Sequence, residues 1–563
     1  KHPKPSGKVF RYGTAGFREK ADILDSVFLR MGILAWIRAV ERGKAIGLMV
    51  TASHNKVDDN GIKMIDPDGG MLDPEWEVFA AKLANADGAE AAVDAIISIT
   101  DAVKIDVGLG EDTSETKIKP ESVVYIGRDT RPHSSKLAKL VMEAVLCLGG
   151  KVHDFGVLTT PQLHFCVQHR NSTNENDRKL AQESGYYSKL CESYRKIVNP
   201  LKRKAGAPSK LIVDAGYGVG GEKFKSLLKI LNESTLYLDV EVRNTATEED
   251  MRDENVAAKL NNNVGAEHVQ KQRKIPKGTL DPDSEKMTRF ASFDGDADRI
   301  VYFYLNEASE FVLLDGDKIA SLIAQFVKKC CDQLPEDLRS TISIGVVQTA
   351  YANGASMDFL KNTMKLDAPL TKTGVKHLHH VALNYDIGIY FEANGHGTAL
   401  FRPDVISRLE KAKLEGNLQE SEISSVDKLL TFSSLINQAT GDAMADALAV
   451  EAILYLEKMT ITDWSKLYED LPSRQLKVTV ADRTAIKTIA DESKTTAPEA
   501  LQPEIDRIVS TYEQGRAFVR PSGTEDVVRI YAEAKTQEKA NELALKICQA
   551  AYDIAGGVGA RPE

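Results

Sequence analysis

Three segments of the chain repeat one order of patterns: an apolar run, a polar loop, a stretch of helical periodicity and a second apolar run. They begin at "SVVYIGRD" (122–129), "SKLIVDAG" (209–216) and "ISIGVVQT" (342–349). Two short apolar runs joined through a helix predict a β-α-β unit, whose helices pack on the faces of a sheet. Three copies therefore predict three related α/β domains with mixed sheets between helices.

The C-terminal region follows another pattern. A strand-like run at 471–483 is followed by a helical stretch at 497–515, two strands around a loop at 516–534, and a helix that stops at Gly556. This order predicts a compact α+β domain. Because 563 residues suit several domains of ordinary size, we expect four domains. Their predicted ranges are 1–178, 179–305, 306–455 and 456–563.

The charge and hydropathy of the chain limit the kinds of molecule that it can bind. The chain has 72 Lys and Arg against 82 Asp and Glu, a net charge of −10, so its overall field repels nucleic acid and anionic membranes. No apolar run reaches the roughly 18 residues of a membrane span. An anionic substrate must therefore be bound by local basic residues. The sequence leaves the oligomeric state open.

Six scattered cysteines form no CxxC pair and no zinc-binding spacing. The first ten residues, "KHPKPSGKVF", lack the apolar core of a secretory signal. Reduced thiols and the absence of a signal predict a cytoplasmic protein.

A carboxylate-rich loop lies between two apolar runs in "FASFDGDADRIVYFYL". Asp294, Asp296 and Asp298 alternate there, and three carboxylates so close together repel one another unless a cation compensates them. Hard oxygen ligands suit Mg²⁺ or Ca²⁺, but the spacing is not that of an EF-hand, because Arg299 and Leu305 stand where Gly and Glu are needed. The alternative is a solvated acidic turn.

Ser53 follows another apolar run, in "LMVTASHN". A hydroxyl at the end of a buried strand is either a turn residue or a nucleophile.

The stretch "VRPSGTEDVVRIY" combines a guanidinium, two hydroxyls and a turn of backbone amides. Arg520, Ser522, Gly523 and Thr524 have the composition of a phosphate-binding cradle, since arginine binds phosphate through two hydrogen bonds. The alternative is a hairpin turn, which Pro-Ser-Gly also favours.

A third polar group occurs in "IGIYFEANGHGTALF". Glu392, Asn394 and His396 alternate at a predicted strand end, and alternate strand residues share a face. A carboxylate, an amide and an imidazole on one face can bind sugar hydroxyls. The alternative is an ordinary polar strand end.

A glycine pattern supports a rival function. Gly216, Gly218 and Gly221 satisfy G-x-G-x-x-G between a strand and a helix, and Asp239 lies on the next strand-like run. This arrangement is typical of dinucleotide-binding oxidoreductases. A tight strand-to-helix turn explains the same glycines.

Taken together and in order, "TASHN" with "DNGIK", "FDGDADR", "EANGHG" and "RPSGTEDVVRIYAEA" resemble the motifs of the α-D-phosphohexomutases. Asn394 stands where most of that family has serine, which resembles the phosphoacetylglucosamine mutase branch. The resemblance implies three α/β domains and a C-terminal domain similar to the TATA-binding-protein fold, around one central cleft. The chain departs from the family's "TASHNP" at Lys56, which would loosen that loop or add a charge to it.

The resemblance also implies the function and its residues. Phosphoserine at Ser53, with Mg²⁺, would interconvert N-acetylglucosamine 6-phosphate and 1-phosphate through a 1,6-bisphosphate and so feed UDP-N-acetylglucosamine synthesis. The alternatives are a glucose or mannose phosphate mutase, the oxidoreductase, and a non-catalytic sugar-phosphate binder. The implied catalytic residues are Ser53, His54, Lys63, Arg18 and Arg299; the metal ligands are Ser53, Asp294, Asp296 and Asp298; the substrate contacts are Gly374, Lys376, Glu392, Asn394, His396, Arg520, Ser522, Gly523, Thr524 and Arg529.

Overall fold

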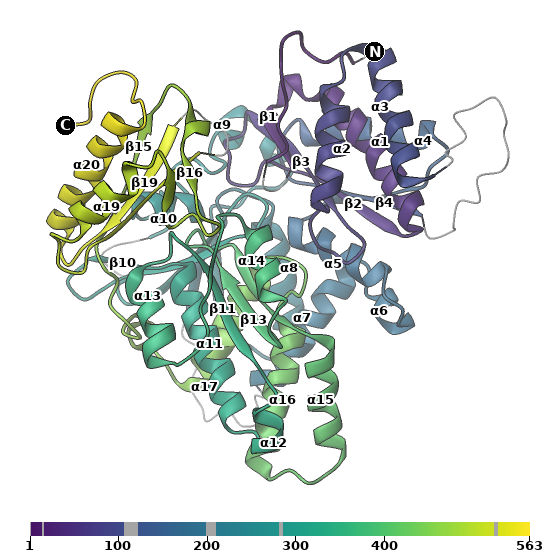
Figure 1. Ribbon diagram of the computed structural model, residues 1–563. Coiled ribbons are helices and arrows are strands. Elements are labelled where there is room, and N and C mark those ends of the chain that lie inside the picture. Colours follow the sequence, from purple (N-terminus) through teal and green to yellow (C-terminus); the bar gives the residue numbers. More distant parts are fainter. Residues whose placement is uncertain (1, 14–15, 106–121, 199–209, 281–284, 523–526) are drawn as a thin grey trace. The chain divides into compact units, whose positions relative to one another are not determined.

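The computed structural model (Figure 1) describes residues 2–13, 16–105, 122–198, 210–280, 285–522 and 527–563. The chain forms two compact units, one of residues 1–313 with 431–452 and the other of residues 314–430 with 453–563. Each unit is described by itself.

The N-terminal sheet is mixed, with strand order β1-β3-β2-β4-β5. Strands β2, β4 and β5 run parallel, while β3 runs antiparallel to both β1 and β2. The turn from β2 to β3 therefore lies at the carboxyl end of β2. The strands are β1 (Phe17–Lys20), β2 (Ala45–Val50), β3 (Asp59–Ile65), β4 (Val123–Arg128) and β5 (Val152–Val157).

Helices cover both faces of this sheet because its central strands are apolar on both sides. Ile46, Leu48 and Val50 belong to the core shared with α1, α2 and α4, whereas Gly47 approaches Val167 of α5 on the opposite face. Figure 1 shows the helices on the two faces of this sheet. These helices are α1 (Asp25–Arg42), α2 (Pro74–Asn85), α4 (Ser134–Cys147) and α5 (Thr160–Arg170); α3 (Gly88–Val103) packs on α2.

The second sheet has the order β10-β9-β8-β6-β7, with β6 parallel to β7 and β8 and with β8 antiparallel to β9. The loop from β8 to β9 carries the three aspartates. The strands are β6 (Leu211–Asp214), β7 (Val240–Arg243), β8 (Arg289–Phe293), β9 (Ile300–Leu305) and β10 (Phe311–Leu314). The α-helices between α5 and β8 are α6 (Glu175–Lys179), α7 (Glu183–Val198), α8 (Gly220–Leu231), α9 (Glu254–Ala257) and α10 (Ala266–Gln272).

The third sheet has the order β12-β11-β13-β14, and its β13–β14 pair is an antiparallel hairpin. Its strands are β11 (Ile344–Thr349), β12 (Leu370–Thr371), β13 (Ile387–Phe391) and β14 (Gly397–Phe401). The helices in this part of the chain are α11 (Gly316–Asp332), α12 (Glu336–Arg339), α13 (Gly354–Asp358), α14 (Val375–Ala382), α15 (Pro403–Leu414), α16 (Glu420–Leu435), α17 (Ala443–Glu457) and α18 (Ile461–Ser465).

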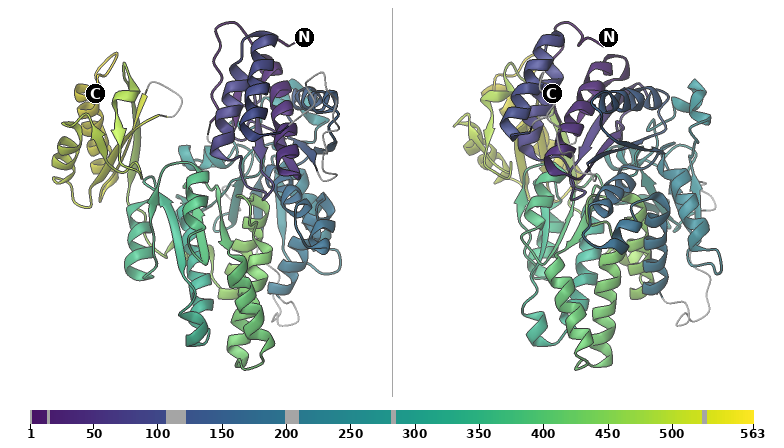
Figure 2. Two further views of the ribbon diagram at one scale, coloured as in Figure 1. Left: turned by 45° about the vertical axis from the view of Figure 1, so that its right-hand side comes forward. Right: turned by 90° about the vertical axis from the view of Figure 1, so that its right-hand side faces the viewer.

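The C-terminal region is an antiparallel sheet of order β15-β19-β18 with two helices on one face (Figure 2). The last helix ends just before Gly556, whose φ of +74° is a backbone conformation that glycine adopts readily. The elements are β15 (Ser473–Thr479), β18 (Arg516–Pro521), β19 (Val527–Glu533), the hairpin β16 (Lys487–Thr488) and β17 (Thr495–Ala497), α19 (Leu501–Val509) and α20 (Gln537–Ile554).

The expected fold class is confirmed in its elements. Each of the three repeated segments forms a β-α-β unit with parallel strands, namely β4-α4-β5, β6-α8-β7 and β11-α13-β12, and the C-terminal region is α+β. The four domain ranges stay a prediction. Within the described residues, every helix is too short or too polar to cross a membrane.

Helix α17 begins against the aspartate loop and carries a buried acid. The Ala443 amide donates to the Ala297 carbonyl oxygen at 3.0 Å, and one turn into the helix Asp446 is fully buried. Neither carboxyl oxygen of Asp446 has a hydrogen-bond partner among the described residues. Burial, and then the charge of Asp442, raise the pKa of Asp446 well above its usual range.

We expect Asp446→Asn to stabilise the protein more at pH 8 than at pH 5. The unfolded chain loses the Asp446 proton above about pH 4, whereas the folded state keeps it up to the raised pKa. The free energy of unfolding of the wild type therefore declines as pH rises from about 4 to that pKa. Each unit of the raised pKa corresponds to about 1.4 kcal/mol. Thermal unfolding of both proteins at the two pH values tests this, and an equal difference in Tm at both would contradict a buried titrating carboxyl.

Candidate active site

Ser53 lies in the turn that joins β2 to β3. It is fully buried, and its Oγ donates to Asp294 Oδ2 at 2.8 Å. Its φ of +51° is uncommon for a residue with a side chain, and such a conformation costs on the order of 1 kcal/mol. The rest of the site must therefore hold the turn in place.

Two side chains clamp the carbonyl oxygens of this turn. Arg131 Nη2 donates to Ser53 O at 3.2 Å and to Asn55 O at 2.6 Å, and Asn261 Nδ2 donates to the same two oxygens at 2.9 and 3.0 Å. These four hydrogen bonds anchor the turn although it lacks the proline of the family's motif. Lys56, which stands in place of that proline, is exposed to solvent. The sequence analysis missed both residues; the available signal was the charged Arg131 in the polar segment that follows β4.

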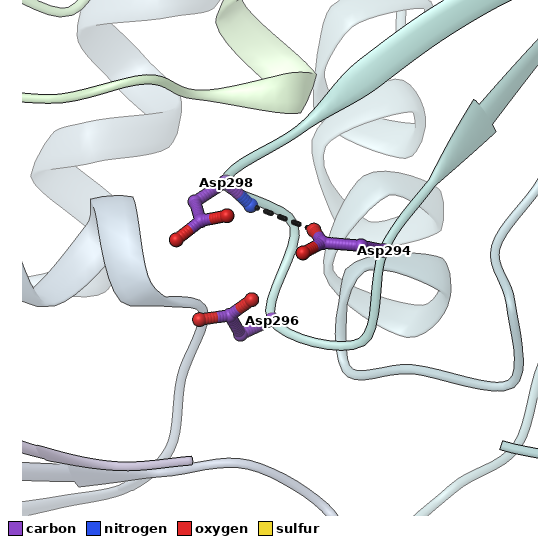
Figure 3. A group of neighbouring side chains, drawn as sticks. All are labelled: Asp294, Asp296 and Asp298. Carbon is purple, nitrogen blue, oxygen red and sulfur yellow. Dashed lines mark hydrogen bonds between the residues drawn. The ribbon is translucent and has the colours of Figure 1, made fainter. Parts of the chain in front are cut away.

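The three aspartates converge in the loop from β8 to β9 (Figure 3). All three are buried, and one oxygen or more of each lies within 4.8 Å of the others. The amides of Asp298 and Arg299 donate to Asp294 Oδ1 at 3.1 and 3.2 Å. Asp296 Oδ1 is buried with no hydrogen-bond partner among the described residues. This donor set fits a hard divalent cation such as Mg²⁺.

Lys63, on β3, compensates part of this negative charge. Its Nζ donates to Asp296 Oδ2 and Asp298 Oδ2, both at 2.7 Å, and Thr160 Oγ1 donates to Asp296 Oδ2 at 2.6 Å. Burial alone would lower the pKa of Lys63, but Asp296 and Asp298 outweigh it and raise that pKa. Lys63 is therefore a stable ammonium, which favours an electrostatic role over proton transfer. Thr160 was not among the predicted residues; its "TTPQ" helix start gave no functional signal.

Burial and mutual repulsion act on the pKa values of the carboxylates. Burial, followed by repulsion from Asp298 and Asp296, raises the pKa of Asp294 well above its usual range. For Asp296 the effect of burial is outweighed by Lys63, so its pKa is lowered. A divalent cation bound to this cluster would favour the ionised form of Asp294.

Two guanidinium groups lie beside the cluster. Arg299 Nε is 3.8 Å from both Asp294 Oδ2 and Asp298 Oδ1. Burial and the positive charge of Arg299 lower the pKa of Arg18, on β1. Two half-buried cations that repel each other favour binding of an anion such as a phosphoryl group.

His54 adjoins the serine and is largely buried. Burial and the charges of Arg299 and Arg18 lower its pKa well below the usual range, so its imidazole is neutral at pH 7. Its Nδ1 is 3.5 Å from Ser53 Oγ and its Nε2 is 3.4 Å from Glu267 Oε2.

The glycine-rich turn before α8 supports the aspartate loop. The Val219 amide donates to Gly295 O at 3.0 Å, and a Cβ on Gly218 would lie 2.5 Å from the same oxygen. A Cβ on Gly295 would in turn lie 2.5 Å from Ser53 O. The glycines therefore permit three backbones to stack closely, and protein occupies the place where a dinucleotide pyrophosphate would need to bind.

The predicted sugar-contact residues lie in the second unit. The expectation that Glu392, Asn394 and His396 share a strand face is wrong, because β13 ends at Phe391 and the chain reverses before β14. Instead they form a tight turn, in which Asn394 Nδ2 donates to Glu392 Oε2 at 3.1 Å and Asn394 Oδ1 accepts from the His396 amide at 3.0 Å.

A second loop joins this turn. The amide of Gly374 donates to Glu392 Oε1 at 2.9 Å, and Lys376 lies in the first turn of α14, which begins directly after Gly374. The two predicted sugar-contact segments, which are distant in sequence, are therefore neighbours.

The predicted phosphate-binding residues lie on the β18–β19 hairpin. Arg520 and Arg529 are direct cross-strand partners, and the Ser522 amide donates to Val527 O at 2.9 Å. Gly523 and Thr524 lie outside the described residues. Two opposed guanidinium groups at one end of a hairpin favour binding of an anion.

Models of known protein families match four parts of the chain. They are phosphoglucomutase/phosphomannomutase alpha/beta/alpha domain I, at 33–90 and 81–175; phosphoacetylglucosamine mutase AMG1 domain II, at 176–301; phosphoacetylglucosamine mutase AMG1 domain III, at 315–459; and the phosphoglucomutase/phosphomannomutase C-terminal domain, at 476–550.

Relatives of known name match the chain over its full length. The phosphoacetylglucosamine mutase of Homo sapiens is 44% identical over 562 residues, which cover 100% of this chain and 97% of that protein. The Aspergillus fumigatus N-acetylphosphoglucosamine mutase in complex with GlcNAc-6P and magnesium has a TM-score of 0.87 and 39% identity, and the match covers 98% of this chain and 97% of that one. A variant of the Aspergillus enzyme in complex with glucose 1,6-bisphosphate has the same TM-score, identity and coverage. The chain is thus a member of the phosphoacetylglucosamine mutase family, within the α-D-phosphohexomutases.

Proposed function

We propose that this chain interconverts N-acetylglucosamine 6-phosphate and N-acetylglucosamine 1-phosphate through a phosphoserine at Ser53. The observation that carries the proposal is the 2.8 Å hydrogen bond from Ser53 Oγ to Asp294, inside a buried cluster of three carboxylates. A serine held against a magnesium-binding carboxylate is placed to accept and donate a phosphoryl group.

The reaction consists of two phosphoryl transfers. In the first, the bond from phosphorus to Ser53 Oγ breaks as that phosphorus bonds to O1 of N-acetylglucosamine 6-phosphate, and the O1 proton passes to Ser53 Oγ, which gives the 1,6-bisphosphate. The bisphosphate then turns over. In the second, the bond from the 6-phosphorus to O6 breaks as that phosphorus bonds to Ser53 Oγ, O6 takes the proton that Ser53 Oγ gives up, and N-acetylglucosamine 1-phosphate leaves. Mg²⁺ bound by Asp294, Asp296, Asp298 and a phosphoserine oxygen would neutralise phosphoryl charge.

The remaining predicted catalytic residues of this unit bind or position the reacting groups. Arg18 and Arg299 bind the transferring phosphoryl group, and the Lys63 ammonium holds Asp296 and Asp298 in position for the metal. His54, as a neutral imidazole, orients the phosphoserine turn.

The second unit recognises the rest of the substrate. Glu392, Asn394, His396, Gly374 and Lys376 contact the sugar, and the β18–β19 hairpin binds the phosphate that is not reacting. The hairpin residues are Arg520, Ser522, Gly523, Thr524 and Arg529. A cytoplasmic location and a role in supplying UDP-N-acetylglucosamine synthesis complete the proposal.

Replacing Ser53 with alanine tests the function directly. Ser53→Ala should abolish mutase turnover, because no oxygen remains to carry the phosphoryl group, and intact-mass spectrometry should find a phosphoryl group on the wild-type protein only. The control is Ser407→Ala, which removes an exposed hydroxyl on α15. Turnover of Ser53→Ala near the wild-type rate would refute the phosphoserine mechanism.

Replacing Asp296 with asparagine tests the metal site. Asp296→Asn removes one of three anionic ligands, so Mg²⁺ affinity measured by calorimetry should fall at least about tenfold, or ~1.4 kcal/mol. Thr160→Val is the matched control, because it deletes a hydrogen bond to Asp296 but keeps all three charges, and it should retain Mg²⁺ binding. Equal Mg²⁺ affinity in the wild type and Asp296→Asn would exclude this loop as the metal site.

Replacing Asn394 with serine tests substrate selectivity. Asn394→Ser shortens the side chain and removes the amide donor, and one such contact is worth on the order of 1 kcal/mol. The ratio of kcat/KM for N-acetylglucosamine 6-phosphate to that for glucose 6-phosphate should therefore fall several-fold. The exposed Asn362→Ser should leave the ratio unchanged. A constant ratio in Asn394→Ser as well would show that Asn394 does not set selectivity.

A further inference from the structure

Glu492 connects the phosphate-binding hairpin with a sugar-contact loop. It lies in the turn between β16 and β17 with a φ of +63°, an uncommon conformation for a residue with a side chain. Its Oε2 accepts from the Thr373 amide at 3.0 Å and lies 3.6 Å from Arg520 Nη1. Strained backbone of this kind persists where the surrounding contacts require it.

The partners of Glu492 place it between two recognition elements. Thr373 directly precedes Gly374, whose own amide donates to Glu392 Oε1 at 2.9 Å. Two consecutive amides of one loop are thus bound by two glutamates, one from the sugar-contact turn and one from the C-terminal region. Movement of Glu492 therefore affects the loop and Arg520 together.

Tyr351 fixes the other side of Arg520. Its hydroxyl accepts from Arg520 Nε at 3.1 Å, and the guanidinium carbon lies 5.3 Å from the centre of its ring. The ring packs edge-on against Phe518 of β18 at 5.0 Å. Since one side of the guanidinium is occupied by neutral Tyr351, Glu492 supplies the nearby negative charge.

We propose that Glu492 is a positioning residue, and that through it the binding of a phosphate group by Arg520 depends on whether that phosphate is joined to a sugar. In the free enzyme its carboxylate partly neutralises Arg520, and an incoming phosphate must compete with it for the guanidinium. A phosphate joined to a sugar gains further contacts at the loop of Thr373 and Gly374, whereas inorganic phosphate gains none. Glu492 weakens the contact of Arg520 with either phosphate, but its hydrogen bond to the Thr373 amide holds the loop that only a sugar phosphate contacts. Its net effect is therefore to disfavour inorganic phosphate relative to sugar phosphates. This inference rests on the proposed function, which assigns Arg520 to the substrate phosphate.

Two substitutions separate the two contacts of Glu492. Glu492→Gln keeps an oxygen that can accept from the Thr373 amide but removes the charge beside Arg520, whereas Glu492→Ala removes both. The measurements are the inhibition constant of inorganic phosphate, and KM and kcat for N-acetylglucosamine 6-phosphate. Glu513→Gln is the matched control, because Glu513 is an exposed partner of Lys535 in the same region.

In Glu492→Gln the inhibition constant of inorganic phosphate should fall by about two- to fivefold, the range expected for a partly exposed ion pair. KM for the sugar phosphate should fall by a similar factor, because this variant keeps an acceptor for the Thr373 amide, so discrimination should be lost only in Glu492→Ala. Glu492→Ala should show the same tighter phosphate inhibition together with a raised KM, because the loop loses its anchor. In an Arg520→Ala background, Glu492→Gln should change the phosphate constant no further.

An unchanged or raised phosphate constant in Glu492→Gln would overturn the inference, and so would an equal fall in the Arg520→Ala background, which would indicate a general charge effect. A merely structural glutamate predicts weaker binding of both ligands. An Arg520→Ala enzyme with wild-type KM would instead contradict the phosphate-binding hairpin of the proposed function, and this inference with it. The same inhibition and KM assays distinguish these outcomes from one another.

Discussion

Burial of three carboxylates on one loop is the constraint on which the rest of the active site depends. Asp294, Asp296 and Asp298 have almost no exposed surface, so their charge must be balanced from within the protein. The compensation comes from segments far apart in sequence, namely Lys63 on β3, the Thr160 hydroxyl and the Ser53 hydroxyl. Burial, and then repulsion from Asp298 and Asp296, still raise the pKa of Asp294, and a divalent cation bound to the three carboxylates would oppose both effects.

Close backbone packing holds this loop against the turn that carries Ser53. Gly218, Gly295 and the carbonyl of Ser53 stack so closely that a Cβ on either glycine would clash. The clamp by Arg131 and Asn261 then holds Ser53 in its left-handed conformation. Strain at Ser53 is thereby offset by hydrogen bonds from two neighbouring segments, and its hydroxyl stays directed at Asp294.

The sequence predicted the elements better than the contacts between them. Periodicity located the β-α-β units, and the alternating aspartates indicated a metal site, because both signals are local. The same local reasoning placed Glu392, Asn394 and His396 on a strand face, although the chain turns after Phe391. It also left the G-x-G-x-x-G pattern open to a dinucleotide, because the motif alone does not show that Gly295 fills that space. Arg131, Asn261 and Thr160 were missed for the same reason.

The sequence by itself determined the order of the elements, the loop of three carboxylates, the serine after a buried strand and the resemblance that joins them. Those features depend on spacing along the chain, where side-chain periodicity and local charge repulsion act. Only the tertiary structure decided which groups compensate the carboxylates, what the glycine turn packs against, and that Glu492 joins a sugar-contact loop to Arg520. These are long-range contacts, and their energies depend on burial and on distances between residues separated by many positions in the chain.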